Sequence, residues 1–243
     1  MSNFNETNDK EINSYISKYL NTVLRIDDRG DTLVATIAET IGRDIIEGRR
    51  NPGDDLNTVD LAREFNSSRT PIREALLILE KEGLVQVPAR RRPRVALLDI
   101  QQIREIYQIR TSLHQLVAEL VVKNATDEEI NSLGKILEKM VSAVANHDIQ
   151  GYFWLNVSFH IRAGEICGNE TLRQLINSFG LQTLKMRYIS LSQPNRNEES
   201  AEDHIRLLRA FRERDEILAA TISRSNLKSA LHAIEQSYKE NAK

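Results

Sequence analysis

Arginines are concentrated in one short stretch of the sequence, where they could bind the phosphates and base edges of DNA. Arg69 and Arg73 flank the start of a predicted helix. Four more arginines follow within a few residues: Arg90, Arg91, Arg92 and Arg94. A guanidinium group can pair with guanine in the major groove, neutralise phosphates or enter a minor groove of negative potential. The alternative is a solvated basic face, which so dense a group of arginines after a helix makes the weaker interpretation.

The elements that would position these arginines form a predicted winged helix-turn-helix. Apolar periodicity and turn residues predict helices over 31–47 and 59–65, the second capped by Thr58, and a third helix from Arg69 to the stop at Gly83. Two short strands over 84–87 and 94–97 would form a basic hairpin, the wing. In this plan the third helix enters the major groove. The hydroxyls of Ser68 and Thr70 can then bind phosphate.

Composition agrees with a globular protein that carries one local anion-binding surface. The 243 residues have a net charge of −2, yet 63–94 contains eight Lys or Arg against four Glu. The single cysteine, Cys167, permits no intramolecular disulfide and fits a reducing cytoplasm. The sequence has no apolar run of about 20 residues and no signal-peptide pattern at its start. We therefore expect a cytoplasmic protein that does not contact membranes.

The rest of the chain is predicted to be helical, so the fold class is mainly α. An extension over 1–30, with an amphipathic helix at about 10–25, precedes the DNA-binding domain over 31–98. From 99 to 243 we predict an all-α domain of six helices. Their ranges are 100–123, 126–147, 149–167, 171–191, 199–213 and 215–239.

The string Ser-Arg-Thr-Pro-x-Arg-Glu-Ala-Leu, which begins at Ser68, resembles the GntR family of bacterial transcription regulators. The resemblance extends over Leu61–Val85. It implies that Arg69, Thr70 and Arg73 contact operator DNA. One departure concerns the wing, where Arg92-Pro93 stands near the position at which the family usually has glycine.

The C-terminal half resembles the FCD effector domain of the FadR branch, in its six-helix VanR-like group. Phe159-His160 followed by Asn169, and His204 followed by Asp215, match the spacing of that domain. Many FCD domains bind a divalent metal such as zinc through one Asp and three His. The four corresponding positions here are Asn156, His160, His204 and Asn226.

Both outer positions of this set are asparagine, and an amide is a weaker metal ligand than carboxylate or imidazole. Two interpretations stay open, a metal-loaded site and a metal-free polar pocket. A third is that the two histidines are hydrogen-bonded core residues. Four buried polar positions that converge would be costly without a ligand, ion or water to satisfy them.

Four further residues are candidates for binding the effector. Arg110, which matches an arginine of the first FCD helix, could bind a carboxylate with two hydrogen bonds, or could form an interhelical salt bridge. His114 lies one turn further on. Tyr107 and Arg187 are weaker candidates.

The combined interpretation is a homodimeric repressor of a catabolic operon, which binds a palindromic operator and is released by a small acidic metabolite. The alternatives are a metal-responsive regulator and a metal-dependent enzyme. An enzyme is disfavoured because the sequence has no general base in register, nucleophile elbow, phosphate loop or glycine-rich cofactor motif.

Overall fold

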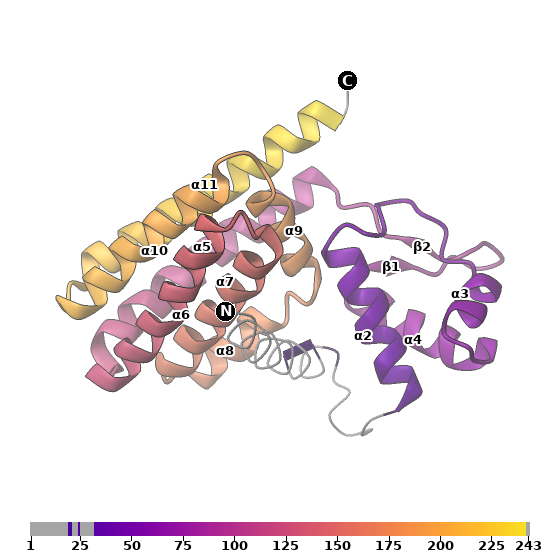
Figure 1. The fold of residues 1–243 in the computed structure, drawn as a ribbon, viewed down its shortest axis with the longest axis horizontal. Coiled ribbons are helices and arrows are strands. Elements are labelled where there is room, and N and C mark those ends of the chain that lie inside the picture. The colour runs from indigo at the N-terminus through magenta and orange to yellow at the C-terminus, as the bar shows by residue number, and fades with distance from the viewer. Residues whose placement is uncertain (1–18, 21–23, 25–31, 242–243) are drawn as a thin grey trace. The chain divides into compact units, whose positions relative to one another are not determined.

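The computed structural model describes residues 19, 20, 24 and 32–241. The predicted N-terminal extension and its helix at about 10–25 therefore lie almost wholly outside the described residues. The described fold is mainly helical with one small sheet, which confirms the predicted fold class (Figure 1). No helix of the described part combines the length and apolar character that a membrane span requires.

The described residues group into two compact units. The first unit contains those up to Leu98 together with Phe179–Lys185, and the second contains Asp99–Ser178 and the residues from Met186 onward. A hydrogen bond within the first unit ties its two segments together, since Gln182 Nε2 donates to the carbonyl oxygen of Gly83 at 3.0 Å. The helix α9 (Gln182–Leu191) has its first residues in the first unit and its remaining residues in the second.

Three helices of the first unit enclose an apolar core: α2 (Leu33–Ile46), α3 (Thr58–Glu64) and α4 (Arg69–Lys81). Apolar residues recur at helical spacing on α2 and α4 and lie between the two helices. They are at most 1% exposed and comprise Ile37, Ile41, Ile45, Ile72, Leu76 and Leu79. Because these residues are buried, the opposite face of α4 is exposed to solvent.

Thr58 does not cap α3, so that prediction was wrong. The side chain of Asn57 accepts a hydrogen bond from the backbone N–H of Val59 at 3.0 Å, and Thr58 is the first helical residue. Asparagine is at least as favourable an N-cap as threonine, because its amide oxygen satisfies an N–H group of the first turn. The cap consequently lies one residue earlier than predicted.

The wing is a short hairpin of β1 (Val85–Gln86) and β2 (Arg94–Val95), paired antiparallel with Val85 opposite Val95. Its loop has Arg90 at a φ of +62°, in the left-handed region. A residue with a Cβ atom in this region costs about 1 kcal/mol relative to glycine. The turn is therefore made without the glycine usual in the family.

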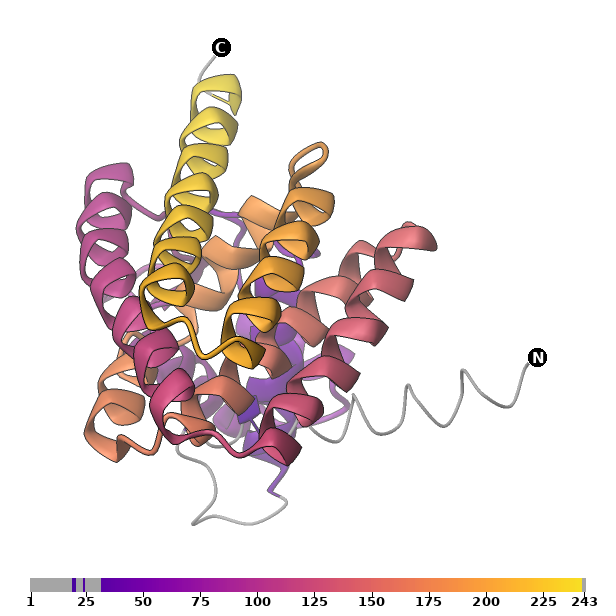
Figure 2. The same cartoon turned by 90° about the vertical axis from the view of Figure 1, so that its left-hand side faces the viewer.

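The second unit consists of long helices packed along one another, with α5 and α11 side by side (Figures 1 and 2). Besides the later turns of α9, its helices are α5 (Ile100–Asn124), α6 (Asp127–Ala145), α7 (Ile149–Ile166), α8 (Glu170–Asn177), α10 (Arg196–Arg212) and α11 (Glu216–Asn241). Short polar caps separate them. Thr126 and Glu129, for example, form a capping box at the start of α6.

The single helix predicted over 171–191 is two helices, α8 and α9. The break contains Gly180, whose φ of +63° is incompatible with a continuing right-handed helix. The described part of the chain after Leu98 accordingly has seven helices instead of the six predicted.

Candidate functional site

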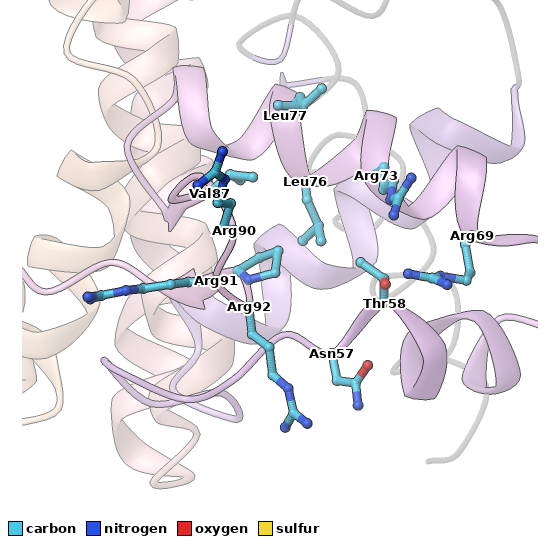
Figure 3. A pocket seen from close by; sticks show the side chains of 11 residues that line it. Asn57, Thr58, Arg69, Arg73, Leu76, Leu77, Val87, Arg90, Arg91 and Arg92 are labelled. Carbon is cyan, nitrogen blue, oxygen red and sulfur yellow. The ribbon is translucent and has the colours of Figure 1, made fainter.

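Arginines from α4 and the wing line one groove on the first unit (Figure 3). Its volume is about 460 Å³. Arg69 and Arg73 project from α4, and the wing loop contributes the other three arginines, Arg90, Arg91 and Arg92. The structure thus brings together five of the eight residues predicted to bind DNA.

The other three predicted DNA contacts, Ser68, Thr70 and Arg94, are exposed but do not line this groove. Ser68 occupies the N-cap position of α4, and its side chain makes no capping hydrogen bond. Arg94 Nε donates to a carboxylate oxygen of Asp55 at 2.8 Å, so its charge is partly neutralised within the unit. Phosphate binding by Arg94 would have to compete with that ion pair.

The groove is strongly cationic. In the described part of the chain, Arg69, Arg73, Arg90 and Arg91 form no ion pair with a carboxylate, and Arg92 has only a 3.7 Å contact with Asp55. Unpaired guanidinium groups on an exposed surface attract polyanions and can displace the counterions of DNA. The arrangement can therefore bind a phosphate backbone while the start of α4 reaches base edges.

Sequence reasoning missed the polar contribution of Asn57 and Thr58, which also line the groove. Figure 3 shows the guanidinium of Arg69 on the side of the groove where Thr58 lies. The signal that could have found these residues is positional, since the start of the first helix of a helix-turn-helix crosses the DNA backbone.

In the second unit, the predicted metal-set residues Asn156, His160 and His204 meet in the interior. Asn156 and His160 lie one turn apart on α7, and His204 lies on α10. His204 Nε2 is 3.4 Å from Asn156 Nδ2 and 3.3 Å from His160 Nε2. His204 is fully buried and Asn156 is nearly so.

The proton positions follow from these contacts. His204 Nδ1 lies 2.6 Å from the carbonyl oxygen of Ser200, which can only accept, so Nδ1 carries the proton. His204 Nε2 then accepts from the Asn156 amide and from Nε2 of His160. The two imidazoles thus satisfy each other without an added ligand.

The predicted effector residues on α5 join the same interior cluster. The imidazole of His114 lies edge-on to that of His160, with ring centroids 5.3 Å apart, and His160 is similarly placed 5.2 Å from His204. Arg110 is 3% exposed, and its guanidinium lies 4.9 Å from the ring centroid of Tyr107. Arg110 Nη1 and His114 Nε2 are buried and have no hydrogen-bond partner among the described residues.

All three imidazoles are held neutral. Burial is the largest cause, and it lowers the pKa of His204 to about 4 and those of His114 and His160 well below their usual value. Nearby guanidinium groups lower these pKa values further, and Arg187 on α9 acts on all three histidines. The charge of the cluster therefore comes from arginine.

Arg196, at the start of α10, is a cluster residue that sequence reasoning missed. It is 3% exposed, and its Nη2 donates to the carbonyl oxygen of Asn226 at 3.1 Å and to the amide oxygen of the same residue. Its Nε and Nη1 have no hydrogen-bond partner in the described part of the protein. Arg196 is the first residue of α10. Neither apolar periodicity nor a sequence motif predicts that an arginine at the start of this helix is buried.

The predicted metal ligands fit a divalent cation poorly. The amide oxygen of Asn226 already accepts from Arg196, and no carboxylate belongs to the set. The guanidinium groups of Arg187 and Arg196 lie close enough to lower the pKa of His204, so they would also repel a cation. Among the described residues, no group of three or more His, Cys, Asp or Glu has an arrangement that could hold a metal. Metal binding stays a prediction that the donor set does not favour.

Comparison with known proteins assigns both units to described families. The model for bacterial regulatory proteins of the gntR family matches 33–95, and the FCD domain model matches 105–229. The chain is 32% identical over 173 residues to the uncharacterized HTH-type transcriptional regulator YdhC of Bacillus subtilis, covering 70% of this chain and 77% of that protein.

Two further matches broaden the comparison. The chain is 30% identical over 164 residues to the gluconate operon transcriptional repressor of Bacillus subtilis, covering 68% of this chain and 66% of that protein. The solved structure of E. coli McbR/YncC matches with a TM-score of 0.72 at 23% identity, covering 85% of this chain and 99% of that one. This last similarity shows a shared fold.

Proposed function

The chain belongs to the gntR family of bacterial regulatory proteins and carries an FCD domain, and from this premise we propose that it represses transcription until a small anionic metabolite binds its helical unit. It is a DNA-binding transcriptional regulator and not an enzyme, as predicted from the sequence. Its finer activity, as a ligand-released repressor of a catabolic operon, is the proposal.

The observation that carries the DNA-binding half is the shared groove of α4 and the wing. Arg69 and Arg73 stand at the end of α4 that would approach base edges, and the wing arginines stand where phosphates would pass. Repression needs no more than occupation of a promoter. A relative named as the repressor of the gluconate operon supports this direction of control.

The ligand-binding half is supported by buried guanidinium groups in which some N–H groups have no hydrogen-bond acceptor. Arg110 and Arg196 both present N–H groups in the interior of the second unit without an acceptor among the described residues. Leaving such groups unpaired is costly, so a bound anion would stabilise the unit. Gluconate, after which the operon of the Bacillus subtilis relative is named, is itself a small carboxylate.

Coupling between the two activities is proposed to pass along α9. The first residues of this helix belong to the DNA-binding unit. Arg187 belongs to the helical unit, where its charge lowers the pKa of the three histidines. A ligand that draws Arg187 toward it would therefore shift a helix that both units share. Such a shift would change the population of conformations able to bind DNA.

We further propose that the repressor is a cytoplasmic homodimer on a palindromic operator. Two copies of α4 would then read two half-sites about one helical turn apart. Selection of genomic fragments by the purified protein, followed by footprinting, tests this. Two protected half-sites with inverted sequence and a complex of two chains are expected, whereas one protected half-site per complex would refute the dimer.

The effector is tested by a thermal-shift screen of organic acids, with and without zinc, followed by operator titration. The proposal expects at least one acid to raise the melting temperature and to weaken operator binding. Acids that stabilise the protein without changing operator affinity would contradict ligand control.

A further inference from the structure

Arg196 is a buried cation with unused hydrogen-bonding capacity. Two of its nitrogen atoms, Nε and Nη1, have no partner among the described residues, although the side chain is only 3% exposed. A buried charge with unpaired N–H groups is strongly destabilising unless an anion or another acceptor meets it. Nε and Nη1 lie on different edges of the guanidinium group, so each could donate a separate hydrogen bond to an anionic acceptor.

Arg196 is anchored at the predicted metal set itself. Its Nη2 donates to both oxygens of Asn226, so one member of the set is committed to holding a guanidinium group. Asparagine at this position and at Asn156 removes an imidazole and a carboxylate that the FCD pattern would supply. A carboxylate at 156 would attract the neighbouring arginines and compete with an anionic ligand. The two substitutions and the buried arginine are thus mutually consistent.

A second arginine with unpaired capacity, Arg110, lies on α5 one turn before His114. The rings of His114, His160 and His204 contact one another in succession, with centroids 5.3 and 5.2 Å apart. His204 lies on α10, the helix that begins with Arg196, so these ring contacts connect the helices that carry the two arginines. Arg110 Nη1 and His114 Nε2 supply unpaired nitrogen atoms on α5.

Arg110 and Arg196 carry positive charge that no carboxylate contact balances among the described residues. The guanidinium of Arg110 lies over the ring of Tyr107, and that of Arg196 donates to Asn226, so both partners are uncharged. A monoanion would balance one of these two arginines, whereas a dianion can balance both.

We infer that the guanidinium of Arg196 takes the place of the family's metal ion, and that the helical unit binds a small dicarboxylate without metal, one carboxylate on Arg196 and the other on Arg110 and His114. This inference rests on the proposed function and specifies its ligand. The three imidazoles form successive contacts from the helix of Arg110 to the helix of Arg196. His204 and His160 are already paired with each other, so they set the spacing instead of binding the anion.

The test uses the full-length protein, freed of metal on a chelating resin and checked by elemental analysis. Thermal stability is measured with straight-chain dicarboxylates from malonate to adipate, with acetate, propionate and butyrate as monocarboxylate controls, and with zinc alone. We expect at least one dicarboxylate to stabilise the metal-free protein well above every monocarboxylate, and zinc to have no effect. No stabilisation by any dicarboxylate, or a requirement for zinc, overturns the inference.

Two variants test whether Arg196 binds the dicarboxylate. Arg196→Gln should weaken binding of the best dicarboxylate by about tenfold or more in calorimetric titration, because it removes a charged hydrogen-bond donor group. Arg206→Gln, which changes an exposed arginine on the same helix, should bind it as the wild type does. Equal losses in both variants would contradict the assignment. If Arg196→Gln does not fold, the wild-type ligand series still decides the outcome.

Operator titration separates this inference from the proposed function. Release of the operator by a monocarboxylate, or only in the presence of zinc, would leave the ligand-responsive repressor standing and refute the metal-free dicarboxylate site. Failure of every small anion to release the operator would refute the proposed function itself.

Discussion

His204 donates through Nδ1 to the carbonyl oxygen of Ser200, 2.6 Å away and one turn earlier on α10. This bond fixes the tautomer, so that Nε2 faces Asn156 and His160 as an acceptor. The bond to Ser200 by itself raises the pKa of His204, whereas burial, the largest cause, and the charges of Arg187 and Arg196 lower it. Burial of this imidazole among arginines therefore makes the helical unit sensitive to acid.

We predict that the protein loses stability as the pH falls from about 6.5 to about 4. Burial lowers the pKa of His204 to about 4 in the folded protein, whereas the unfolded chain titrates near the ordinary value. The unfolded state therefore binds more protons in this window, and His204 alone costs at most about 1.4 kcal/mol per pH unit. His114 and His160, whose pKa values are lowered too, add to the loss.

Urea unfolding at pH 7 and pH 5 measures this effect, and NMR of the imidazole nitrogens measures its cause. The His204→Asn variant should show a weaker pH dependence than the wild type, and His147→Gln, which changes an exposed histidine, should show the same dependence as the wild type. Titration of His204 near pH 6.5 in the folded protein would contradict the account.

Arg73→Ala should weaken operator binding by about 1–3 kcal/mol, because this side chain lies on the face of α4 that lines the groove. A gel-shift titration gives the affinity. The matched control is Arg63→Ala on α3, an exposed arginine outside the groove, which should change the affinity little. Equal affinities for wild type and Arg73→Ala would remove Arg73 from the interface.

The wing arginines should differ in their contribution to the salt dependence of operator binding. Each phosphate contact contributes about 0.9 to the slope of log affinity against log salt. Arg91→Ala should lower that slope by about one contact, whereas Arg94→Ala should lower it less because Arg94 is paired with Asp55 at 2.8 Å. Titrations at several salt concentrations compare the two, and equal slopes for both variants would show that the ion pair does not restrain Arg94.

Arg110→Ala should abolish release of the operator by the effector and leave operator binding intact. Arg110 is buried in the helical unit and has an unpaired Nη1, so its loss removes a ligand contact without touching the DNA-binding groove. Arg104→Ala, on the same helix and paired with Glu235, controls for the loss of an α5 arginine. Loss of DNA binding by Arg110→Ala would make Arg110 structural instead.

The DNA-binding unit could be predicted closely from the sequence, because its signals are local. The apolar spacing of α4, the stop at Gly83 and the dense wing arginines each depend on residues near one another in the chain. The family resemblance that these residues carry is confirmed by the match of 33–95 to the gntR family model.

The ligand cluster was predictable only in part, because it is assembled from five helices that are distant in sequence. Arg110, His114, His160 and His204 could be selected from spacing and family register. Arg196 could not, since no local pattern shows that it is buried against Asn226. The break between α8 and α9 was missed for a related reason, because Gly180 lies within an otherwise helical pattern and only its left-handed backbone reveals the turn.

The arginines of α4 and the wing are proposed to form a DNA-reading surface that is controlled from the helical unit. The most direct test is one operator titration, performed with and without the small organic acid that stabilises the wild type best, on wild type, Arg73→Ala and Arg110→Ala. We predict tight binding weakened by the ligand for the wild type, weak binding for Arg73→Ala, and tight binding that the ligand does not change for Arg110→Ala. Wild-type affinity that is the same with and without ligand, or unaffected by Arg73→Ala, would contradict this proposal.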